Sequence, residues 1–459
     1  MSMKKTAAFL LAASMLLSAA SCSSGTGTAG SSAAGSADST SEAAGTESAE
    51  ETPANTEGVT IQFWHTRGAG PNGDQVEKAV STFNETNESG ITVEQIYQGS
   101  YVDTLAKVMQ SVAAGNAPQV VMLERAAGIP VAASGGALYD MSEFIERDNF
   151  DMDNFPEALL GFSYYDDQIV SLPYCRSTPV FYYNVKMLED ANLEVPTTID
   201  EMVNVCSTLA KTENGETSVY GFELLNDPAW YVQNMLYQLG SNLISEDGKS
   251  CPALEDGTML KVLTAWREWV DAGWCASPTV TDAATALEDQ FSQGKIACFI
   301  QSCGSMRGII ENATAAGVEV GVAYLPTWTD PSAPTGGGNI AIMSPNTTEE
   351  QAEAAWQFIK FLMSDEQVAD NSISTGYVPV TKSVTENADI QALWEEDPRF
   401  KVAYDQLLEC GQELPWSDYK NEFETAMVTV CSKLIIDRSI TPEEAVEELK
   451  TEASTIFPQ

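Results

Sequence analysis

Apolar and polar positions alternate between strand-like and helix-like periods along the chain from residue 59 onward. The segment "VTIQFW" at 59–64 has the short apolar run of a buried strand, and a polar, glycine-rich loop follows it. Val76, Ala79, Val80 and Phe83 then recur at the i, i+3, i+4, i+7 spacing of an amphipathic helix. The next strand, helix and strand are predicted at 91–98, 101–116 and 117–124. This βαβ order predicts an α/β fold with a parallel, doubly wound sheet, in which ligands bind beyond the carboxyl ends of the strands.

The alternation continues through the rest of the chain. A helix is predicted over 196–212, with Thr198 as its N-cap and Glu201 as the capping-box partner three residues later. The segment "STPVFYYN" at 177–184 predicts a strand, and the polar "YCRS" stands at its start. Further helices are predicted at 258–274 and 348–368, and further strands at 294–301 and 318–326. No repeat period appears, and no segment after the N-terminus is long and apolar enough to span a membrane.

The first 57 residues differ in composition from the rest. A basic start, "MSMKK", and the short apolar run "TAAFLLAASMLLSAA" predict a secretory signal peptide over 1–21. The following "AASC" resembles the lipobox of bacterial lipoproteins, whose cysteine, here Cys22, becomes the lipidated first residue. Residues 22–57 are rich in Ser, Thr, Ala and Gly and predict a flexible linker. We therefore expect a secreted protein, anchored by lipid to the outer face of the cell membrane.

Length and charge narrow the class of protein. A chain of 459 residues is too long for one ordinary core, so two lobes of roughly 150 to 200 residues are expected. The 66 acidic and 23 basic residues give a net charge of −43. Such a field repels nucleic acid and anionic lipid surfaces, so we exclude both as partners of the folded part. Solubility in an aqueous compartment suffices to explain the acidity.

Cysteine and histidine usage argues against a metal or cofactor. Eight cysteines remain after Cys22, an even count that permits disulfides in an exported protein, but no CxxC spacing occurs. Several of them lie in apolar or helical patterns, which favours free thiols: Cys175, Cys206, Cys251, Cys275, Cys298, Cys303, Cys410 and Cys431. With one histidine and no cysteine cluster, no metal site and no cofactor are predicted.

Several short segments in a fixed order carry a family resemblance. They are "FWH", "YQGSY", "GNAPQVV", "STPVFYYN", "PTTIDEM", "FSQGKIAC", "QSCGSM", "GGGNIAI", "AAWQFIKFL" and "STGYVPVT". Together they resemble the extracellular solute-binding proteins of bacterial ABC importers over essentially the whole of 59–459. Five of them, "FWH", "YQGSY", "STPVFYYN", "QSCGSM" and "STGYVPVT", also resemble the branch of that family that binds sn-glycerol 3-phosphate.

The resemblance implies a two-lobed, maltose-binding-protein-like fold with a three-crossing hinge that closes on its ligand. It places the N-lobe at 58–173 and 304–374, and the C-lobe at 174–303 and 375–459. The crossings then fall at "YCRSTP", "QSCGS" and "STGYVP", three polar loops. A monomer that captures a small solute and delivers it to ABC permease subunits is the implied arrangement.

Residue by residue, the resemblance implies ligand contacts in this cleft. They fall at Tyr101, Glu124, Ser177, Ser302, Gly338 and Tyr377. A carboxylate accepts hydrogen bonds from sugar hydroxyls, tyrosines offer phenols and flat faces, and glycines allow close backbone approach. Trp230, in "NDPAWYVQ", is a loop aromatic that either stacks on a sugar ring or packs in the core.

Phosphate specificity is the point at which the chain departs from that branch. The branch carries a phosphate-binding arginine near its C-terminus, whereas the corresponding segment 415–427 contains none. We take Arg176, with Arg67, as the candidate replacement, because bidentate arginine suits phosphate. The alternative for each is a surface or glutamate-paired arginine. The solute is therefore either sn-glycerol 3-phosphate or a glycerophosphodiester, or else a neutral or acidic oligosaccharide.

Catalysis is a weaker interpretation. The only histidine, His65, lies in the "FWH" segment, where a structural or rim role is favoured over a catalytic triad. A secreted glycosidase needs two carboxylates, which the composition supplies, but no segment marks such a pair. We therefore expect a binding protein rather than an enzyme.

Overall fold

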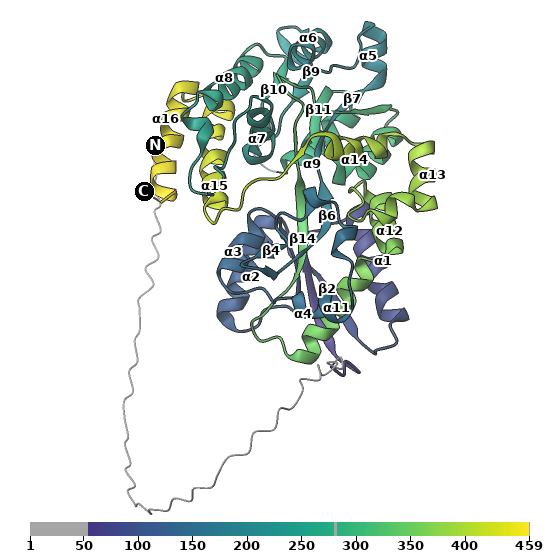
Figure 1. Ribbon diagram of the computed structural model, residues 1–459. Helices are drawn as coiled ribbons and strands as arrows, with labels where there is room; N and C mark the ends of the chain where they lie inside the picture. The colour runs from purple at the N-terminus through teal and green to yellow at the C-terminus, as the bar shows by residue number, and fades with distance from the viewer. Residues whose placement is uncertain (1–53, 280–281, 459) are drawn as a thin grey trace, which may run out of the picture. The chain divides into compact units, whose positions relative to one another are not determined.

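The computed structural model describes residues 54–279 and 282–458. These residues belong to one compact unit. The predicted signal peptide, the predicted lipid attachment site Cys22 and the part of the predicted linker up to residue 53 lie outside the described residues. The architecture below is therefore that of residues 54–279 and 282–458 (Figure 1).

Two mixed sheets organise the body. The first has the order β2-β1-β3-β14-β6, from strands Thr92–Tyr97, Thr60–His65, Val120–Glu124, Gly336–Ile342 and Leu172–Ser177. The second has the order β10-β9-β11-β7-β12, from Cys275–Ala276, Glu216–Glu223, Ile296–Ser302, Pro179–Asn184 and Val320–Ala323, with β8 (Lys211–Glu213) beside β9. Two small sheets pair β13 (Ala333–Pro334) with β15 (Gly411–Gln412) and β4 (Tyr164–Tyr165) with β5 (Gln168–Ile169).

Helices pack on both sheets. On the first sheet lie α1 (Pro71–Thr86), α2 (Tyr101–Ala114), α3 (Gly128–Ser134) and α11 (Glu349–Leu362). On the second lie α5 (Val185–Ala191), α6 (Ile199–Leu209), α8 (Thr258–Asp271), α9 (Ala283–Ser292) and α14 (Arg399–Cys410). The remaining helices are α4 (Ser142–Arg147), α7 (Pro228–Gln238), α10 (Met306–Ala315), α12 (Asp365–Thr375), α13 (Ala388–Glu396), α15 (Lys420–Cys431) and α16 (Pro442–Ile456).

Local signals predicted several of these elements. Thr198 caps α6, and Glu201 completes the capping box as expected. The predicted helix over 348–368 is instead two helices, because α11 ends at Leu362 and Ser364 starts α12 in an extended conformation. The tryptophan of the "AAW" segment, Trp356, is fully buried in the core.

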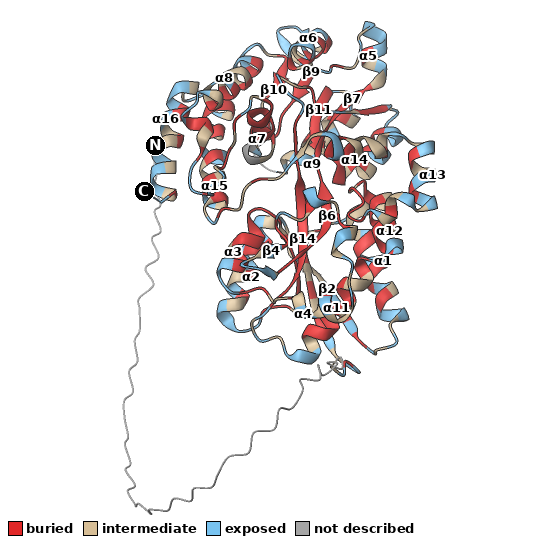
Figure 2. Cartoon of the chain, viewed as in Figure 1, coloured by how far each residue is buried: buried red, intermediate tan, exposed pale blue. Residues whose placement is uncertain are grey.

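The expectation of a parallel sheet holds only in part. Strands β1, β2 and β3 are parallel, but β14 runs antiparallel between β3 and β6. In the second sheet, β7 is antiparallel to both β11 and β12. Each sheet therefore combines a βαβ core with antiparallel strands from distant parts of the chain. Figure 2 shows β14, β6 and β11 buried along most of their length, as strands covered on both faces must be.

The chain passes between the sheets at the first crossing that was predicted. Strand β6 belongs to the first sheet and β7 to the second, with only Thr178 between them. The second predicted crossing needs correction. After residue 304 the chain still adds β12 to the second sheet, and it rejoins the first sheet only with β14 at Gly336. The apolar run of β12 pairs with β7, a partner that sequence spacing could not indicate.

The eight cysteines after Cys22 are free thiols, as favoured from the sequence. Seven of them are buried, and Cys410 is partly exposed. Burial raises the pKa of Cys251, Cys303 and Cys431 to about 12, which keeps these thiols protonated and unreactive.

Candidate functional site

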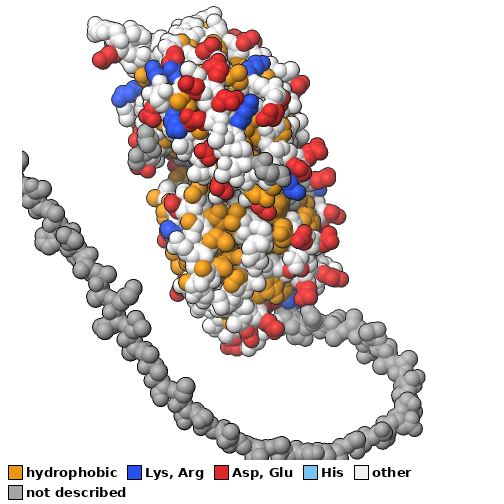
Figure 3. All heavy atoms as spheres, turned by 90° about the vertical axis from the view of Figure 1, so that its left-hand side faces the viewer, with side chains coloured by type: hydrophobic (Ala, Val, Ile, Leu, Met, Phe, Trp, Pro, Cys, Tyr) orange, Lys and Arg blue, Asp and Glu red, His pale blue; other side chains and the backbone are white. Residues whose placement is uncertain are grey.

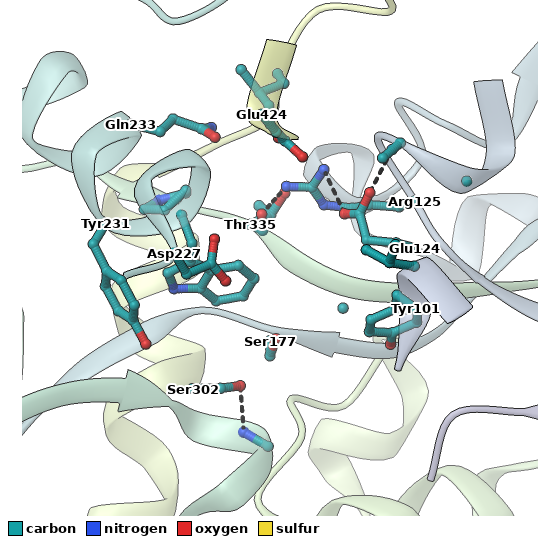
Figure 4. A pocket seen from close by; sticks show the side chains of 18 of the residues that line it. Tyr101, Glu124, Arg125, Ser177, Asp227, Tyr231, Gln233, Ser302, Thr335 and Glu424 are labelled. Atoms are coloured by element: carbon teal, nitrogen blue, oxygen red, sulfur yellow. Dashed lines mark hydrogen bonds and ion pairs between the residues drawn. The ribbon is translucent and has the colours of Figure 1, made fainter. Parts of the chain in front are cut away.

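A cavity of about 540 Å³ is lined by residues of both sheets and of the helices beside them. Its lining includes six of the residues expected from the sequence: Tyr101, Glu124, Ser177, Trp230, Ser302 and Tyr377. They come from α2, the end of β3, the end of β6, α7, the end of β11 and the loop after α12. The pocket therefore lies where the strands of the two sheets end, as expected for α/β folds. Figure 4 shows it from close by.

Two glycines make room for the floor of the pocket. A Cβ atom on Gly336 would lie 1.7 Å from the Trp230 ring, so only glycine lets the indole pack on this strand. Gly337 has φ +86°, and a Cβ there would lie 1.8 Å from the carbonyl oxygen of Cys175. The "GGG" segment thus brings β14 against β6 and seats Trp230 in the pocket wall.

Glu124 and Arg125 form the charged corner of the pocket. One carboxylate oxygen of Glu124 accepts hydrogen bonds from the backbone N–H groups of Ala126, at 2.8 Å, and Ala127. The guanidinium of Arg125 donates to the carbonyl oxygen of Thr335 and lies 3.6 Å from the other Glu124 oxygen (Figure 4). Nε of Arg125 is 3.5 Å from a carboxylate oxygen of Glu413. Arg125 is therefore a pocket residue whose charge is balanced by two acids.

Arg176 lies beneath the pocket and not on it. Its side chain has no exposed surface and is absent from the lining. Nε donates to the carbonyl oxygen of Gly336 at 3.0 Å, and the Nη atoms donate to Leu159, Thr335 and Glu413. The glutamate-paired alternative is the one that the structure shows. The hypothesis that Arg176 contacts the solute is wrong, because the side chain is fully buried and its N–H groups already donate hydrogen bonds to protein atoms.

Three further residues singled out in the sequence are also absent from the pocket lining: Arg67, Gly338 and His65. Arg67 is buried, donates to Asn371 Oδ1 at 2.6 Å and lies over the Tyr377 ring at 5.3 Å. Its role is to hold Tyr377, so the proposal of a direct contact with solute is not supported. Gly338 faces the hydroxyl of Tyr101, which a Cβ would approach to 2.8 Å. His65 is buried beside Gln95, and burial lowers its pKa.

An acidic pair closes the opposite side of the pocket. Asp227 precedes α7, and Glu424 lies on α15, where it pairs with Lys420. Burial raises the pKa of Glu424 to about 7; Lys420 opposes this shift, and the nearby charges of Glu124 and Asp227 add to it. Asp227 is exposed to the pocket. Desolvation by the surrounding protein raises the pKa of its carboxyl, and the positive charge of Lys420 partly offsets this rise. Both carboxyl groups point into the pocket in Figure 4.

Aromatic and small polar groups complete the wall. Burial raises the pKa of Tyr101 and Tyr231 well above the usual value, so both phenols stay protonated; the Tyr231 hydroxyl donates to Gln301 Oε1 at 3.3 Å. Nε1 of Trp230 is buried without a hydrogen-bond partner among the described residues. The Ser302 hydroxyl accepts a hydrogen bond from Gly304 N–H at 3.1 Å. This combination of flat faces, donors and carboxylates suits a solute with several hydroxyl groups.

The sequence interpretation missed the residues that set the charge of the pocket. Asp227 and Tyr231 flank Trp230 in the quoted segment "NDPAWYVQ", and Lys420 and Glu424 lie within 415–427. A helical spacing of four residues between Lys420 and Glu424 predicts an ion pair, but no local signal places that pair in a pocket.

Residues 78–401 match the family described as bacterial extracellular solute-binding protein. This protein belongs to that family. Curated relatives of this solute-binding protein are named as binding proteins rather than enzymes. The sn-glycerol-3-phosphate-binding periplasmic protein UgpB of Rhizobium meliloti (strain 1021) is 24% identical over 359 residues, or 74% of this chain and 79% of the relative. The UgpB of Salmonella typhimurium is 26% identical over 367 residues, or 76% of this chain and 81% of the relative.

Solved structures confirm the maltose-binding-protein-like fold of this solute-binding protein. UgpB from Mycobacterium tuberculosis in complex with glycerophosphocholine has a TM-score of 0.76 at 22% identity, covering 86% of this chain and 98% of that one. The GacH receptor of Streptomyces glaucescens, solved unliganded and with acarbose, has a TM-score of 0.75 at 18% identity, covering 87% of this chain and 98% of that one.

The surface agrees with the composition. Figure 3 shows acidic side chains spread over the face that it displays, with few basic ones. Apolar side chains gather on the lobe of the first sheet, and the exposed hydrophobic residues of the protein include Val102 on α2. None of the helices in the described part of the chain has the length and apolar character of a membrane span.

Proposed function

We propose that this solute-binding protein is a lipoprotein anchored through Cys22, which captures a small polyhydroxylated solute in the pocket and delivers it to the permease of an ABC importer. The observation that carries the proposal is the pocket itself, in which residues of both sheets converge with a tryptophan, three tyrosines and three carboxyl groups. Closure of the lobes around the bound solute would give the permease a state to recognise.

The charge of the lining favours a saccharide over sn-glycerol 3-phosphate. Arg125 is balanced by Glu124 and Glu413, and Lys420 is paired with Glu424. A phosphate would have to displace these acids or approach them, and like charges at short range raise the cost of binding. Sugar hydroxyls can instead donate to the carboxylates while the ring packs on Trp230.

A glycerophosphodiester is the second candidate. Nε and Nη1 of Arg125 are buried without a hydrogen-bond partner among the described residues, although acids lie nearby. A single negative charge or an oxygen-rich group placed there would satisfy them. The solved relative from Mycobacterium tuberculosis binds a ligand of this kind.

A thermal-unfolding screen of the unlipidated body decides between the candidates. A ligand present at 100 times its dissociation constant stabilises the folded state by about 2.7 kcal/mol. Saccharides should raise the unfolding midpoint, and sn-glycerol 3-phosphate should not. If neither saccharides nor glycerophosphodiesters move the midpoint, the proposal fails.

Replacing Trp230 by alanine is expected to weaken solute binding by about 2 kcal/mol, or about thirtyfold, since it removes the flat face from the pocket. Titration calorimetry with the solute from the screen measures the change. Trp328→Ala is the matched control, because Trp328 lies under Lys261 and is not among the lining residues. Equal affinities for the two variants would contradict a stacking role for Trp230.

Replacing Cys22 by alanine should move the protein from the membrane fraction to the culture medium, because the single lipid attachment site would be lost. Fractionation followed by immunoblotting measures this, and wild-type protein labelled with a radioactive fatty acid is the positive control. Retention of the Cys22→Ala protein on membranes would rule out lipid anchoring at this residue.

A further inference from the structure

The carboxylates of the pocket outnumber its bases. Three acids, Glu124, Asp227 and Glu424, line it together with two bases, Arg125 and Lys420. Each base is already opposed by an acid: Arg125 by Glu124 and Glu413, and Lys420 by Glu424. Asp227 has no ion-pair partner among the described residues. A neutral solute would leave this excess negative charge uncompensated when the pocket closes.

The N-cap position of Asp227 accounts for only part of its surroundings. The residue precedes the first turn of α7, and the backbone N–H of Trp230 in that turn stabilises the ionised carboxyl, but the geometry of a full side-chain capping bond is not met. Its carboxyl is instead directed into the pocket, as Figure 4 shows. Desolvation raises its pKa, so the ionised form has a cost that a cation in the pocket would offset.

Aromatic faces lie beside these carboxylates. Trp230 and Tyr231 are in the first turn of α7, directly after Asp227, and both line the pocket. An indole face next to desolvated carboxylates is the environment in which proteins bind ammonium groups, because ring and carboxylate attract the same charge. At the other corner, the unpartnered nitrogens of Arg125 suit oxygen atoms. One side of the pocket therefore suits a positively charged group, and the other suits oxygen atoms.

We propose that the captured solute carries an ammonium group, either a protonated amine or a quaternary nitrogen, on its polyhydroxylated body, and that Asp227 and Glu424 receive it. The inference rests on the solute-binding function proposed above and specifies the class of solute. Oxygen atoms of the same molecule meet Arg125, Tyr101 and Ser177.

Matched ligand pairs test the charge requirement and separate the two sources of the ammonium group. One pair is the glucosamine dimer and its N-acetylated form; the other is glycerophosphocholine and sn-glycerol 3-phosphate. In calorimetric titrations of the unlipidated body, the cationic member of at least one pair should bind about tenfold more tightly than its partner, or better. The pair that shows this preference identifies an amine or a quaternary nitrogen.

The variant Asp227→Asn should abolish the preference while leaving the fold intact, as thermal unfolding without ligand will show. Asp200→Asn is the matched control, because Asp200 is an exposed residue of α6 that does not line the pocket. Equal binding of charged and uncharged partners, or a preference that survives in Asp227→Asn, overturns the inference. If neutral saccharides bind and no cationic ligand does, the inference fails and the proposed function stands. If nothing in either screen binds, both fail.

The pH dependence provides a second readout. The titratable and charged groups that line the pocket with Glu424 are Asp227, which precedes α7, Glu124 and Arg125 at the end of β3, and Lys420 on α15. With a pKa of about 7, Glu424 is mostly neutral at pH 6 and mostly ionised at pH 8. A solute with a quaternary nitrogen, whose charge does not titrate, should therefore bind about tenfold more tightly at pH 8 than at pH 6. Affinity that is flat or falls over this range counts against Glu424 as a receiver of the cation.

Discussion

Replacing Arg176 by alanine is expected to lower the free energy of unfolding by about 3–5 kcal/mol. The side chain is fully buried and links the Leu159 and Gly336 carbonyl oxygens and Glu413. Its removal leaves the half-buried Glu413 with Arg125 as its remaining basic partner, at 3.5 Å, and leaves two carbonyl oxygens with one donor fewer. Urea unfolding followed by tryptophan fluorescence measures the loss.

The control for this variant is Arg438→Ala. Arg438 is about half exposed and lies 3.7 Å from Asp271, so its removal should cost about 1 kcal/mol or less. If Arg176→Ala instead unfolds like the wild type and loses only its affinity for solute, then Arg176 contacts the solute after all, and its placement beneath the pocket is wrong.

Replacing Gly337 by alanine is expected to cost about 3 kcal/mol or more in stability, because two penalties combine. The backbone at Gly337 has φ +86°, a conformation that alanine disfavours, and the added Cβ would lie 1.8 Å from the Cys175 carbonyl oxygen. Since the Cβ is bonded directly to the β14 backbone and the carbonyl oxygen belongs to the β6 backbone, neither can rotate away, and the two strands would have to separate at the pocket floor. Solute affinity should therefore fall as well.

Gly215→Ala separates the two penalties. Gly215 has φ +87°, but a Cβ there would meet nothing within 4 Å, so only the conformational cost of about 1–2 kcal/mol applies. Thermal unfolding of both variants measures the difference. A Gly337→Ala protein no less stable than Gly215→Ala would show that the strands can part without cost.

Much of the local structure could be predicted because its causes are local. The capping box of Thr198 and Glu201 starts α6 through contacts within three residues, and the apolar spacing from Val76 to Phe83 defines the buried face of α1. Short apolar runs located β1, β2, β3, β7 and β11 to within three residues at each end. These elements needed no information about distant parts of the chain.

The order of the strands depends on contacts between distant residues. The place of β14 between β3 and β6 joins residues more than 150 positions apart, and nothing in "GGGNIAI" states which strands it will meet. For the same reason the lobe boundary expected at residue 304 was wrong, since β12 pairs with β7.

The site residues likewise divide into those that short motifs indicated and those that depend on contacts between distant parts of the chain. Family resemblance located Tyr101, Glu124, Ser177, Ser302 and Tyr377, all of which line the pocket. The charge of the site could not be predicted, because it depends on which acid meets which base. Glu413 lies 237 positions from Arg176 in the sequence and is its ion-pair partner. The same carboxylate lies 3.5 Å from Arg125, which lines the pocket.

The sequence by itself determined many of the elements, the family and six of the residues that line the pocket, because periodicity, capping and short motifs are properties of neighbouring positions. Only the tertiary structure decided that Arg176 supports the floor, that Arg125 lines the pocket, and that Asp227 and Glu424 share one cavity. Electrostatic interactions act through space, so the balance of charge in a pocket exists only after the chain has folded.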